Sequence, residues 1–375
     1  MVRILFKYMK IPLARSKINE EEAAAIARVI DRGRLALGPE VTAFEEEFAR
    51  WLAVDAAVAT NSGTSALIVA LRAVGVRPGD EVIVPALTFV ATANAVLNCG
   101  ARPVLVDVLP DSWNLDPLAA AEAIGKNTRA IIAVHLFGLA APMSELIALA
   151  EKANVALVED ACEAIGSTYG SRFVGGLSDV GVFGFYPNKV LTTGEGGMVV
   201  STDTNVVETA RAISNQGYGS SGQLLKRAMP GHSFRMNEFG AALGRAQLDS
   251  IESRLVERDR LAVKYIDALG SVNGLTMPVT DSESRRGWFT FPMLLPQEIN
   301  RDRVMVAMKD QGIETADYFP ALHDLPDYDD FCIQRSPLDT ARDVGQRLLC
   351  VPLWEGLDDG TIETIAAELG KAITS

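Results

Sequence analysis

The chain alternates short apolar runs with longer helical patterns between residues 56 and 161, and this alternation constrains the fold more than any other feature. The apolar runs are rich in Val, Ile, Leu and Ala, show little polar alternation, and occupy residues 56–60, 81–85, 103–108, 130–138 and 155–161. Strands of this kind are buried on both faces, as in a parallel sheet covered by helices. Helical patterns near 62–75, 90–99 and 142–152 supply the crossovers that parallel strands need. We therefore predict an α/β domain whose ligand crevice lies at the carboxyl ends of the strands.

The pattern changes after about residue 250, where a long charged helical segment at 254–270 begins. A strand is expected at 287–295, followed by helices near 301–312 and 361–373. A chain of 375 residues also exceeds the usual size of a single core. We therefore predict a large α/β domain at residues 1–255 and a smaller α+β domain at 256–375, with residues 1–10 as an extension in front of the first folded element.

Composition excludes several classes of partner. The formal net charge of −13 leaves no broad cationic face, so we expect no nucleic-acid partner. The basic N-terminus contains an apolar run of only Ile4, Leu5 and Phe6, whereas a signal peptide needs about 7–15 apolar residues. No run of about 18 apolar residues occurs, and the four cysteines form no C-x-x-C pair. We expect a cytoplasmic protein with reduced thiols, no membrane span and no metal site.

The first candidate site is the stretch TNSGTSAL, which starts at Thr60. It places Gly63, Thr64 and Ser65 at the start of a predicted helix, where free backbone N–H groups and the helix dipole attract an anion. The alternative interpretation is a plain helix cap, because Ser and Thr are favoured there in any case.

The second candidate is a pair of acids that follows the predicted strand at 155–161. Alternation along a strand places Glu159 and Asp160 on opposite faces, so one carboxylate can point into the crevice and stabilise a buried cation. The alternative is a helix cap or a surface turn. His135, at the end of another strand, could be a base, but a satisfied structural histidine is the better interpretation.

The third candidate is Lys189 in the stretch GFYPNKVLTTGEGG. A lysine with a lowered pKa can form a Schiff base with an aldehyde, although a lone loop lysine is usually a solvated charge. Together the three candidates answer one chemical need. Pyridoxal phosphate (PLP) carries a phosphate, a pyridinium nitrogen and an aldehyde, and one group is available for each.

The sequence resembles the DegT/DnrJ/EryC1/StrS family of PLP-dependent sugar aminotransferases, which have the type I aminotransferase fold. The resemblance covers roughly residues 11–370 and is carried by GPEVTAFEEEFA, TNSGTSAL, GDEVIVPALTFVATANAV, HLFG, VEDACEAIGS, FYPNKVLTTGEGGMV, FRMNEFGAALGRAQL, GIETADYFPALH and VPLWEGL. It implies a large domain with a mostly parallel sheet between helices and a smaller α+β C-terminal domain.

The resemblance also assigns roles to residues. Lys189 is the lysine that binds PLP covalently and then moves a proton between substrate and cofactor carbons. Some family members have histidine at this position and are dehydratases, so a lysine here argues against that activity. Asp160 pairs with the pyridinium nitrogen, and Phe89 stacks on the ring. The helix start at Gly63, Thr64 and Ser65 holds the phosphate. The family works as a homodimer, so the segment Gly231–Asn237 is expected to enter the partner's site.

Three positions depart from the family pattern. Position 163, commonly Gln or His near the phenolic oxygen of PLP, is Glu163, which must be protonated, turned away or paired. Position 184, often a phosphate-binding serine, is Gly184, and position 233, often asparagine, is Ser233. We keep Glu163 and Ser233 among the expected cofactor-binding residues.

The resemblance implies a transamination in which L-glutamate (or glutamine) gives its amino group to a nucleotide-linked keto-deoxysugar. The resulting amino sugar would serve polysaccharide or glycoside biosynthesis. The TTGEGG turn resembles family members that act at C4 more than the LGA-type turns of C3 enzymes. Tyr186 and His323 are expected substrate contacts, because their segments should line the cleft between the domains. Two alternatives stay open: a keto-cyclitol or other keto-sugar without a nucleotide as acceptor, and a regulator that binds PLP or sugar without turnover.

Overall fold

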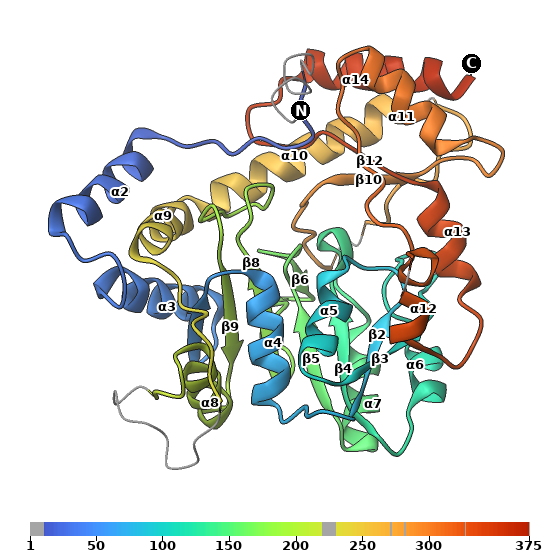
Figure 1. Ribbon diagram of the computed structural model, residues 1–375. Coiled ribbons are helices and arrows are strands. Elements are labelled where there is room, and N and C mark those ends of the chain that lie inside the picture. Colours follow the sequence, from blue (N-terminus) through green and yellow to red (C-terminus); the bar gives the residue numbers. More distant parts are fainter. Residues whose placement is uncertain (1–10, 220–229, 271, 281–282, 327, 375) are drawn as a thin grey trace.

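The computed structural model describes residues 11–219, 230–270, 272–280, 283–326 and 328–374 (Figure 1). The extension predicted for residues 1–10 lies outside the described residues. Among the described residues, no helix combines the length and the apolarity that crossing a bilayer requires.

An eight-stranded sheet with the strand order β1-β9-β8-β5-β4-β2-β3-β11 forms the centre of the fold. Its strands are β1 (Ala56–Thr60), β2 (Glu81–Pro85), β3 (Arg102–Val106), β4 (Thr128–Val134), β5 (Ala156–Asp160), β8 (Val180–Gly184), β9 (Gly197–Ser201) and β11 (Ile333–Gln334). Only β9 runs antiparallel to its neighbours, and the other pairings in this sheet are parallel. The predicted mostly parallel sheet is therefore confirmed.

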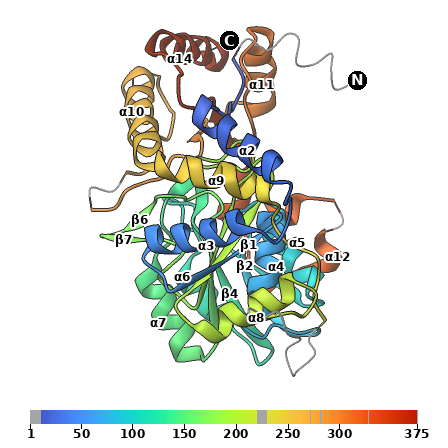
Figure 2. The ribbon, with the colours of Figure 1, turned by 90° about the vertical axis from the view of Figure 1, so that its left-hand side faces the viewer.

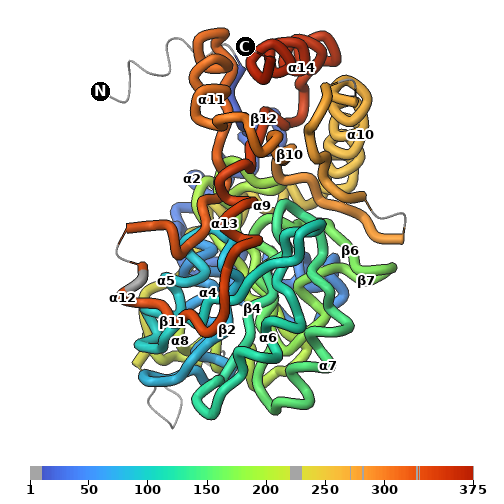
Figure 3. The backbone as a smooth tube through the Cα atoms, turned by 90° about the vertical axis from the view of Figure 1, so that its right-hand side faces the viewer, coloured from blue at the N-terminus to red at the C-terminus, as the bar shows by residue number. Residues whose placement is uncertain are grey.

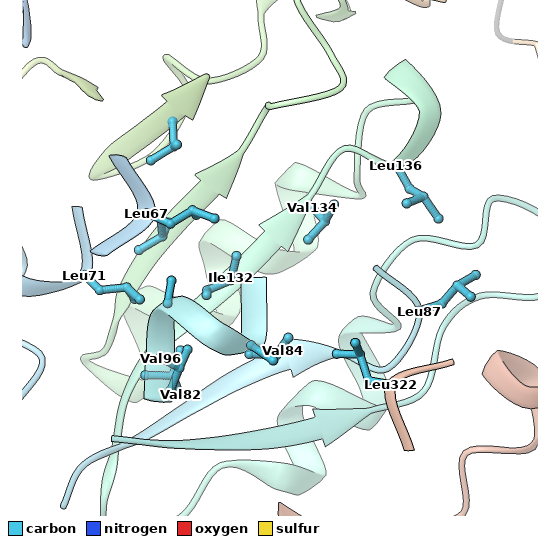
Figure 4. Packing of buried hydrophobic residues seen from close by; sticks show 14 of the residues in the cluster. Leu67, Leu71, Val82, Val84, Leu87, Val96, Ile132, Val134, Leu136 and Leu322 are labelled. Atoms are coloured by element: carbon cyan, nitrogen blue, oxygen red, sulfur yellow. The ribbon is translucent and has the colours of Figure 1, made fainter. Parts of the chain in front are cut away.

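Helices cover both faces of this sheet, as the unbroken apolar runs predict. The covering helices are α3 (Pro39–Leu52), α4 (Gly63–Ala73), α5 (Ala91–Asn98), α6 (Pro117–Ala123), α7 (Met143–Ala153) and α8 (Thr204–Ser214). Helices α4, α5 and α8 pack on one face, where Val82 and Val84 of β2 and Leu67 and Leu71 of α4 belong to one apolar cluster (Figure 4). Ile83 of the same strand points to the opposite face, where α6 and α7 cover it. Residues of β2 thus alternate between two cores.

Two further helices extend the molecule beside the β1 edge. They are α2 (Glu20–Arg32) and α9 (Glu238–Asp249), and they stack with α3 (Figure 2). The Glu238 carboxylate accepts hydrogen bonds from the backbone N–H groups of Gly38, Glu40 and Val41 at 2.9, 2.9 and 3.2 Å. A buried acid therefore caps the first turn of α3, where the helix dipole favours negative charge.

The C-terminal part comprises α10 (Ile251–Leu269), β10 (Phe291–Leu294), α11 (Arg301–Asp310), α12 (Tyr328–Phe331), α13 (Asp339–Arg347), β12 (Leu348–Val351) and α14 (Asp359–Thr374). Its helices α10, α11 and α14 pack at one end of the molecule, whereas α13 packs on the large core and α12 lies beside α5 (Figure 3). The antiparallel pair β10–β12 lies in an apolar core with α10, α11 and α14. Shorter elements are the β6–β7 pair (Thr168–Tyr169 and Arg172–Phe173) and the 3-10 turns η1 (Leu136–Gly138) and η2 (Leu322–Asp324).

Two chain segments cross between the parts on either side of residue 255. β11 pairs in parallel with β3 of the large sheet, and Ile11 forms a parallel bridge with Ile313. The domain boundary at 255 stays a prediction, and these crossings tie the two parts together at both ends of the chain.

Candidate active site

A cavity of about 480 Å³ opens at the carboxyl ends of the strands. Its floor includes Val134 at the end of β4, Asp160 at the end of β5 and Gly184 at the end of β8. A larger hollow of about 690 Å³ lies at the opposite edge, near the start of β5 at Ala156. Ligands of open α/β sheets bind outside the carboxyl ends of the strands, so the smaller cavity is the candidate site.

Lys189 lies in this cavity, and its side chain is only 13% exposed. A tight turn after β8 directs it inward, with its backbone N–H donating to the Tyr186 carbonyl at 2.9 Å. Its Nζ lies 3.6 Å from Oε1 of Glu163 and 3.8 Å above the ring centre of Phe289. The lysine is thus a largely buried amine with one acid and one aromatic face beside it, and not a solvated surface charge.

Asp160 lines the same cavity and is 5% exposed. Its Oδ2 accepts a hydrogen bond from Thr92 Oγ1 at 3.0 Å, and its Oδ1 accepts one from the Cys162 backbone N–H at 3.2 Å. The carboxylate is held in one orientation at the cavity floor and can compensate a cation placed above it.

Glu159 points to the other side of β5, as strand alternation predicts, and is fully buried. It accepts hydrogen bonds from His135 Nε2 at 3.1 Å, from the N–H groups of Gly175 and Leu177, and from Ser178. Burial raises its pKa, but His135 and the backbone donors outweigh this effect, and the net pKa of the Glu159 carboxyl is lowered. His135 also accepts from the Ala141 N–H at Nδ1, so it is a satisfied structural histidine, the interpretation that the sequence favoured over a base.

The start of α4 forms one wall of the cavity through Ser62, Gly63 and Thr64. The Ser62 hydroxyl caps the helix by accepting from the Ser65 N–H at 3.1 Å. In the described part of the chain, no acceptor contacts the N–H groups of Gly63 and Thr64. The helix is capped and still presents two free donors to an anion, so the two interpretations of TNSGTSAL hold together.

Gly184, where the family often has serine, packs closely against Cys162. A Cβ at this position would lie 3.3 Å from Sγ of Cys162, and a Cβ at Gly63 would lie 3.1 Å from the same sulfur. A side chain at position 184 would require the Cys162 side chain to shift by a few tenths of an ångström. Burial raises the pKa of this thiol well above its usual value, so it acts here as a packing group.

Glu163 is paired, which answers the question that its unusual identity raises. It is 7% exposed and has the Lys189 ammonium near Oε1, while Oε2 accepts from the Phe137 N–H at 3.1 Å. Burial raises the pKa of the Glu163 carboxyl, and this effect outweighs the Lys189 charge and the Phe137 N–H, which lower it.

The remaining predicted residues lie in different surroundings. Phe89 and Tyr186 line the cavity and are 53% and 54% exposed, so they stand at its mouth. Ser65 follows Thr64 in α4 and does not line the cavity. His323 is buried and Ser233 is exposed, and neither of them lines the cavity in this chain.

Several lining residues were not predicted from the sequence. They are Thr88, Thr92, Cys162, Asn188, Glu195, Phe289, Tyr318 and Phe319. Thr88 and Thr92 carry a signal in the sequence, because they lie four residues apart on either side of Phe89. In the structure their hydroxyl oxygens lie 3.0 Å apart. Phe289 and Phe319 come from the C-terminal part, 100 and 130 residues after Lys189, and no local pattern identifies them.

The cavity fits PLP on the chemistry of its side chains. It contains a buried amine for the aldehyde, a fixed carboxylate for the pyridinium nitrogen, and free N–H donors at a helix start for the phosphate. Gly63 and Gly184 add no side chains of their own to the wall near the helix start, where Cys162 lies. Fold and cavity together define a PLP-dependent aminotransferase of fold type I.

Comparison with known proteins identifies the family. The model of the DegT/DnrJ/EryC1/StrS aminotransferase family matches residues 16–370, and the chain belongs to this family. It is 37% identical over 353 residues to dTDP-3-amino-3,4,6-trideoxy-alpha-D-glucose transaminase of Streptomyces venezuelae, covering 94% of this chain and 92% of that protein. It is 33% identical over 368 residues to GDP-perosamine synthase of Caulobacter vibrioides, covering 97% and 98%. The crystal structure of DesV from S. venezuelae superimposes with a TM-score of 0.88 at 36% identity, covering 95% of each chain. The protein is thus a PLP-dependent sugar aminotransferase.

Proposed function

We propose that this enzyme moves the amino group of L-glutamate or glutamine to a keto group of a nucleotide-linked deoxysugar, at C4. The observation that carries the proposal is that a largely buried Lys189 and Asp160 line one cavity of a chain aligned over nearly its whole length with two relatives. The printed names of those relatives refer to a dTDP-linked amino sugar and to GDP-perosamine. A nucleotide sugar is therefore the substrate class that we propose here.

Lys189 is the residue proposed to bind PLP covalently and then to carry a proton between carbon atoms. Its Nζ lies inside the cavity, 3.6 Å from Glu163 Oε1, and a lysine amine is the group that forms a Schiff base with an aldehyde. Asp160 would hold the protonated ring nitrogen, and this pairing lets PLP act as an electron sink for the carbon that loses its proton. Phe89 at the mouth is available to cover the ring face.

The phosphate is proposed to lie at the start of α4. The free N–H groups of Gly63 and Thr64 support this assignment. Ser65 belongs to the same first turn, but both its N–H and its hydroxyl are bonded to Ser62, so its role in phosphate binding stays a prediction.

The substrate is proposed to enter over Tyr186, which is exposed at the cavity mouth. The turn at 192–197 borders the cavity through Glu195 and Gly196, and Gly194 has a φ of 80° that favours glycine. The sequence of this turn can therefore influence which sugar carbon approaches Lys189, and the C4 proposal itself rests on the resemblance of TTGEGG to family members that act at C4. His323 remains a prediction without support from the cavity lining.

A homodimer with shared active sites is part of the proposal. Apolar side chains are exposed at Ile30, Leu35 and Leu37, at 62%, 50% and 57%, beside the edge formed by α2 and α3. Ser233 is exposed near the same side of the fold, bridged to Asn215, and is proposed to reach the partner's PLP. Mixing a Lys189→Ala chain with a chain altered at Ser233 tests the sharing, because mixed dimers would regain one intact site.

The substrate proposal is tested by half-reactions. The protein is first converted to its amino form with L-glutamate or glutamine, and the released oxo acid is measured. A panel of nucleotide keto-sugars and keto-cyclitols is then offered, and return of the PLP absorbance identifies the acceptor, while nuclear magnetic resonance of the product locates the new amine. Return of the absorbance with keto-cyclitols alone, or an amine at C3, would overturn the nucleotide-sugar or the C4 assignment respectively.

A further inference from the structure

Glu163 is a second ionisable group within reach of the Lys189 nitrogen, and the assignments above give it no chemical task. We propose that Glu163 is a catalytic acid–base residue, which accepts the proton that the Lys189 ammonium must lose and holds it while Lys189 is covalently bound to PLP.

The geometry leaves one oxygen of Glu163 free for this task. Oε2 is fixed by the Phe137 N–H at 3.1 Å, and Oε1 faces Lys189 Nζ at 3.6 Å. A movement of roughly half an ångström by the flexible lysine side chain brings this pair to hydrogen-bond distance. Hydrogen bonds of catalytic groups are often long before the ligand binds.

The backbone that holds Glu163 is itself fixed. Phe137 has φ 52° and ψ 29°, a left-handed conformation that is unusual for a bulky residue. Its carbonyl accepts from Nε of Arg286 at 3.0 Å, and Arg286 also donates to the Val279 carbonyl. Arg286 thus binds the carbonyl of Phe137, and Glu163 binds its N–H. The Glu163 carboxyl cannot move away from Lys189 without losing its hydrogen bond to the Phe137 N–H.

The proton transfer is balanced within the pair. One N–H bond of the Lys189 ammonium breaks, its electron pair stays on Nζ, and an O–H bond forms at Oε1 of Glu163. The ammonium and carboxylate become an amine and a carboxylic acid, so the net charge of the pair is zero before and after. The amine is then the nucleophile that an aldehyde carbon requires.

The surroundings of Glu163 favour its neutral form once Lys189 no longer carries an ammonium. Asp160 and Cys162 face it from its own segment, Lys189 and Tyr318 lie across the cavity, and Cys350 of β12 lies behind it. Of the groups that the structure describes around this carboxyl, Lys189 supplies the nearest positive charge. Burial already raises the pKa of Glu163 while that charge is present. Loss of the charge leaves a carboxyl beside Asp160 that burial and repulsion both keep protonated.

Infrared spectra of the protein with and without PLP test the proposal. The carbonyl stretch of a protonated carboxylic acid is distinct from the bands of carboxylate and amide groups, and it shifts in D₂O. We expect this band in the PLP-loaded wild type, not in the PLP-free wild type, and not in loaded Glu163→Gln. Loaded Glu195→Gln is the matched control, because Glu195 is another acid of the same cavity, and it should retain the band.

Three results would overturn the proposal: no band in either wild-type form, a band already present without PLP, or a band that survives Glu163→Gln. The two wild-type spectra can reject the proposal by themselves, so it stays testable if the variant fails to fold. As a second readout, we expect the rate at which PLP-free Glu163→Gln regains the PLP absorbance to rise about tenfold per pH unit near neutrality, because hydroxide must replace the lost base. The wild-type rate should be nearly independent of pH over the same range.

Discussion

The two adjacent acids of β5 allow a prediction with a built-in control, because they point to opposite faces of the same strand. Asp160→Asn removes the negative charge from the cavity but keeps the local contacts. The asparagine oxygen can still accept from the Cys162 N–H, and the Thr92 hydroxyl can reverse its role, since Thr88 Oγ1 lies 3.0 Å away as an alternative partner. The folded protein should therefore lose about 1 kcal/mol or less in its free energy of unfolding.

The affinity for PLP should fall much further in Asp160→Asn. A buried cation left without its partner costs about 3–5 kcal/mol, which corresponds to roughly two to four orders of magnitude in the dissociation constant. Glu159→Gln should do the reverse, because it disturbs a fully buried acceptor of several hydrogen bonds away from the cavity. We expect it to lower the free energy of unfolding by about 3–5 kcal/mol and to change PLP affinity less than tenfold.

Equilibrium dialysis with PLP and urea unfolding of the PLP-free proteins measure the two effects separately. We expect Asp160→Asn to lose PLP affinity and keep its free energy of unfolding, and Glu159→Gln to lose free energy of unfolding and keep its PLP affinity. The assignment of Asp160 would be refuted if Asp160→Asn bound PLP within threefold of the wild type. It would also be refuted if Glu159→Gln, while folded, lost as much PLP affinity as Asp160→Asn.

Three further predictions concern pH, packing and the fixed loop. Folding lowers the pKa of the Glu159 carboxyl from its usual 4.5, so its contribution to stability is present above pH 4.5 and is lost as the pH falls through the lowered value. Over that acidic range, the urea midpoint of the wild type should fall more steeply with pH than the urea midpoint of Glu159→Gln. Gly63→Ala should weaken PLP binding by about 1–3 kcal/mol, since the new Cβ would lie 3.1 Å from the Cys162 sulfur, and adding Cys162→Ala should restore part of the loss in the same dialysis assay. Arg286→Met leaves the Phe137 carbonyl without its donor and should lower the free energy of unfolding by about 1–3 kcal/mol, with Arg286→Lys intermediate in urea unfolding.

The sequence predicted the central sheet well because its strands carry their own signal. Runs such as 82–85 and 130–134 are apolar on both faces, and each is followed by a helical pattern that covers one face. The C-terminal part was harder to predict. The apolar run at 287–295 was expected to be one strand, yet only Phe291–Leu294 pairs. The carbonyls of Trp288 and Phe289 instead accept from Arg258, a buried side chain of α10, and Phe289 turns to the Lys189 amine.

The candidate site likewise has residues that the sequence predicts and contacts that it does not predict. Lys189, Asp160 and the helix start at Gly63 stand in local motifs whose residue types point to their chemistry, and the structure brings all of them to one cavity. The contacts that orient them depend on distant segments. Sequence spacing does not reveal that the Phe137 N–H reaches Glu163 across 26 residues. The edge strand β11 was also missed, because a two-residue strand has no recognisable period.

The central claim is that Lys189 is the amine that binds PLP covalently, and chemical trapping tests it most directly. The PLP-loaded protein is reduced with sodium borohydride, digested and analysed by mass spectrometry. We expect the pyridoxyl group on the single peptide that contains Lys189 and on no peptide of the Lys189→Ala protein. Attachment to another lysine of the wild type, or equal trapping in Lys189→Ala, would contradict the account.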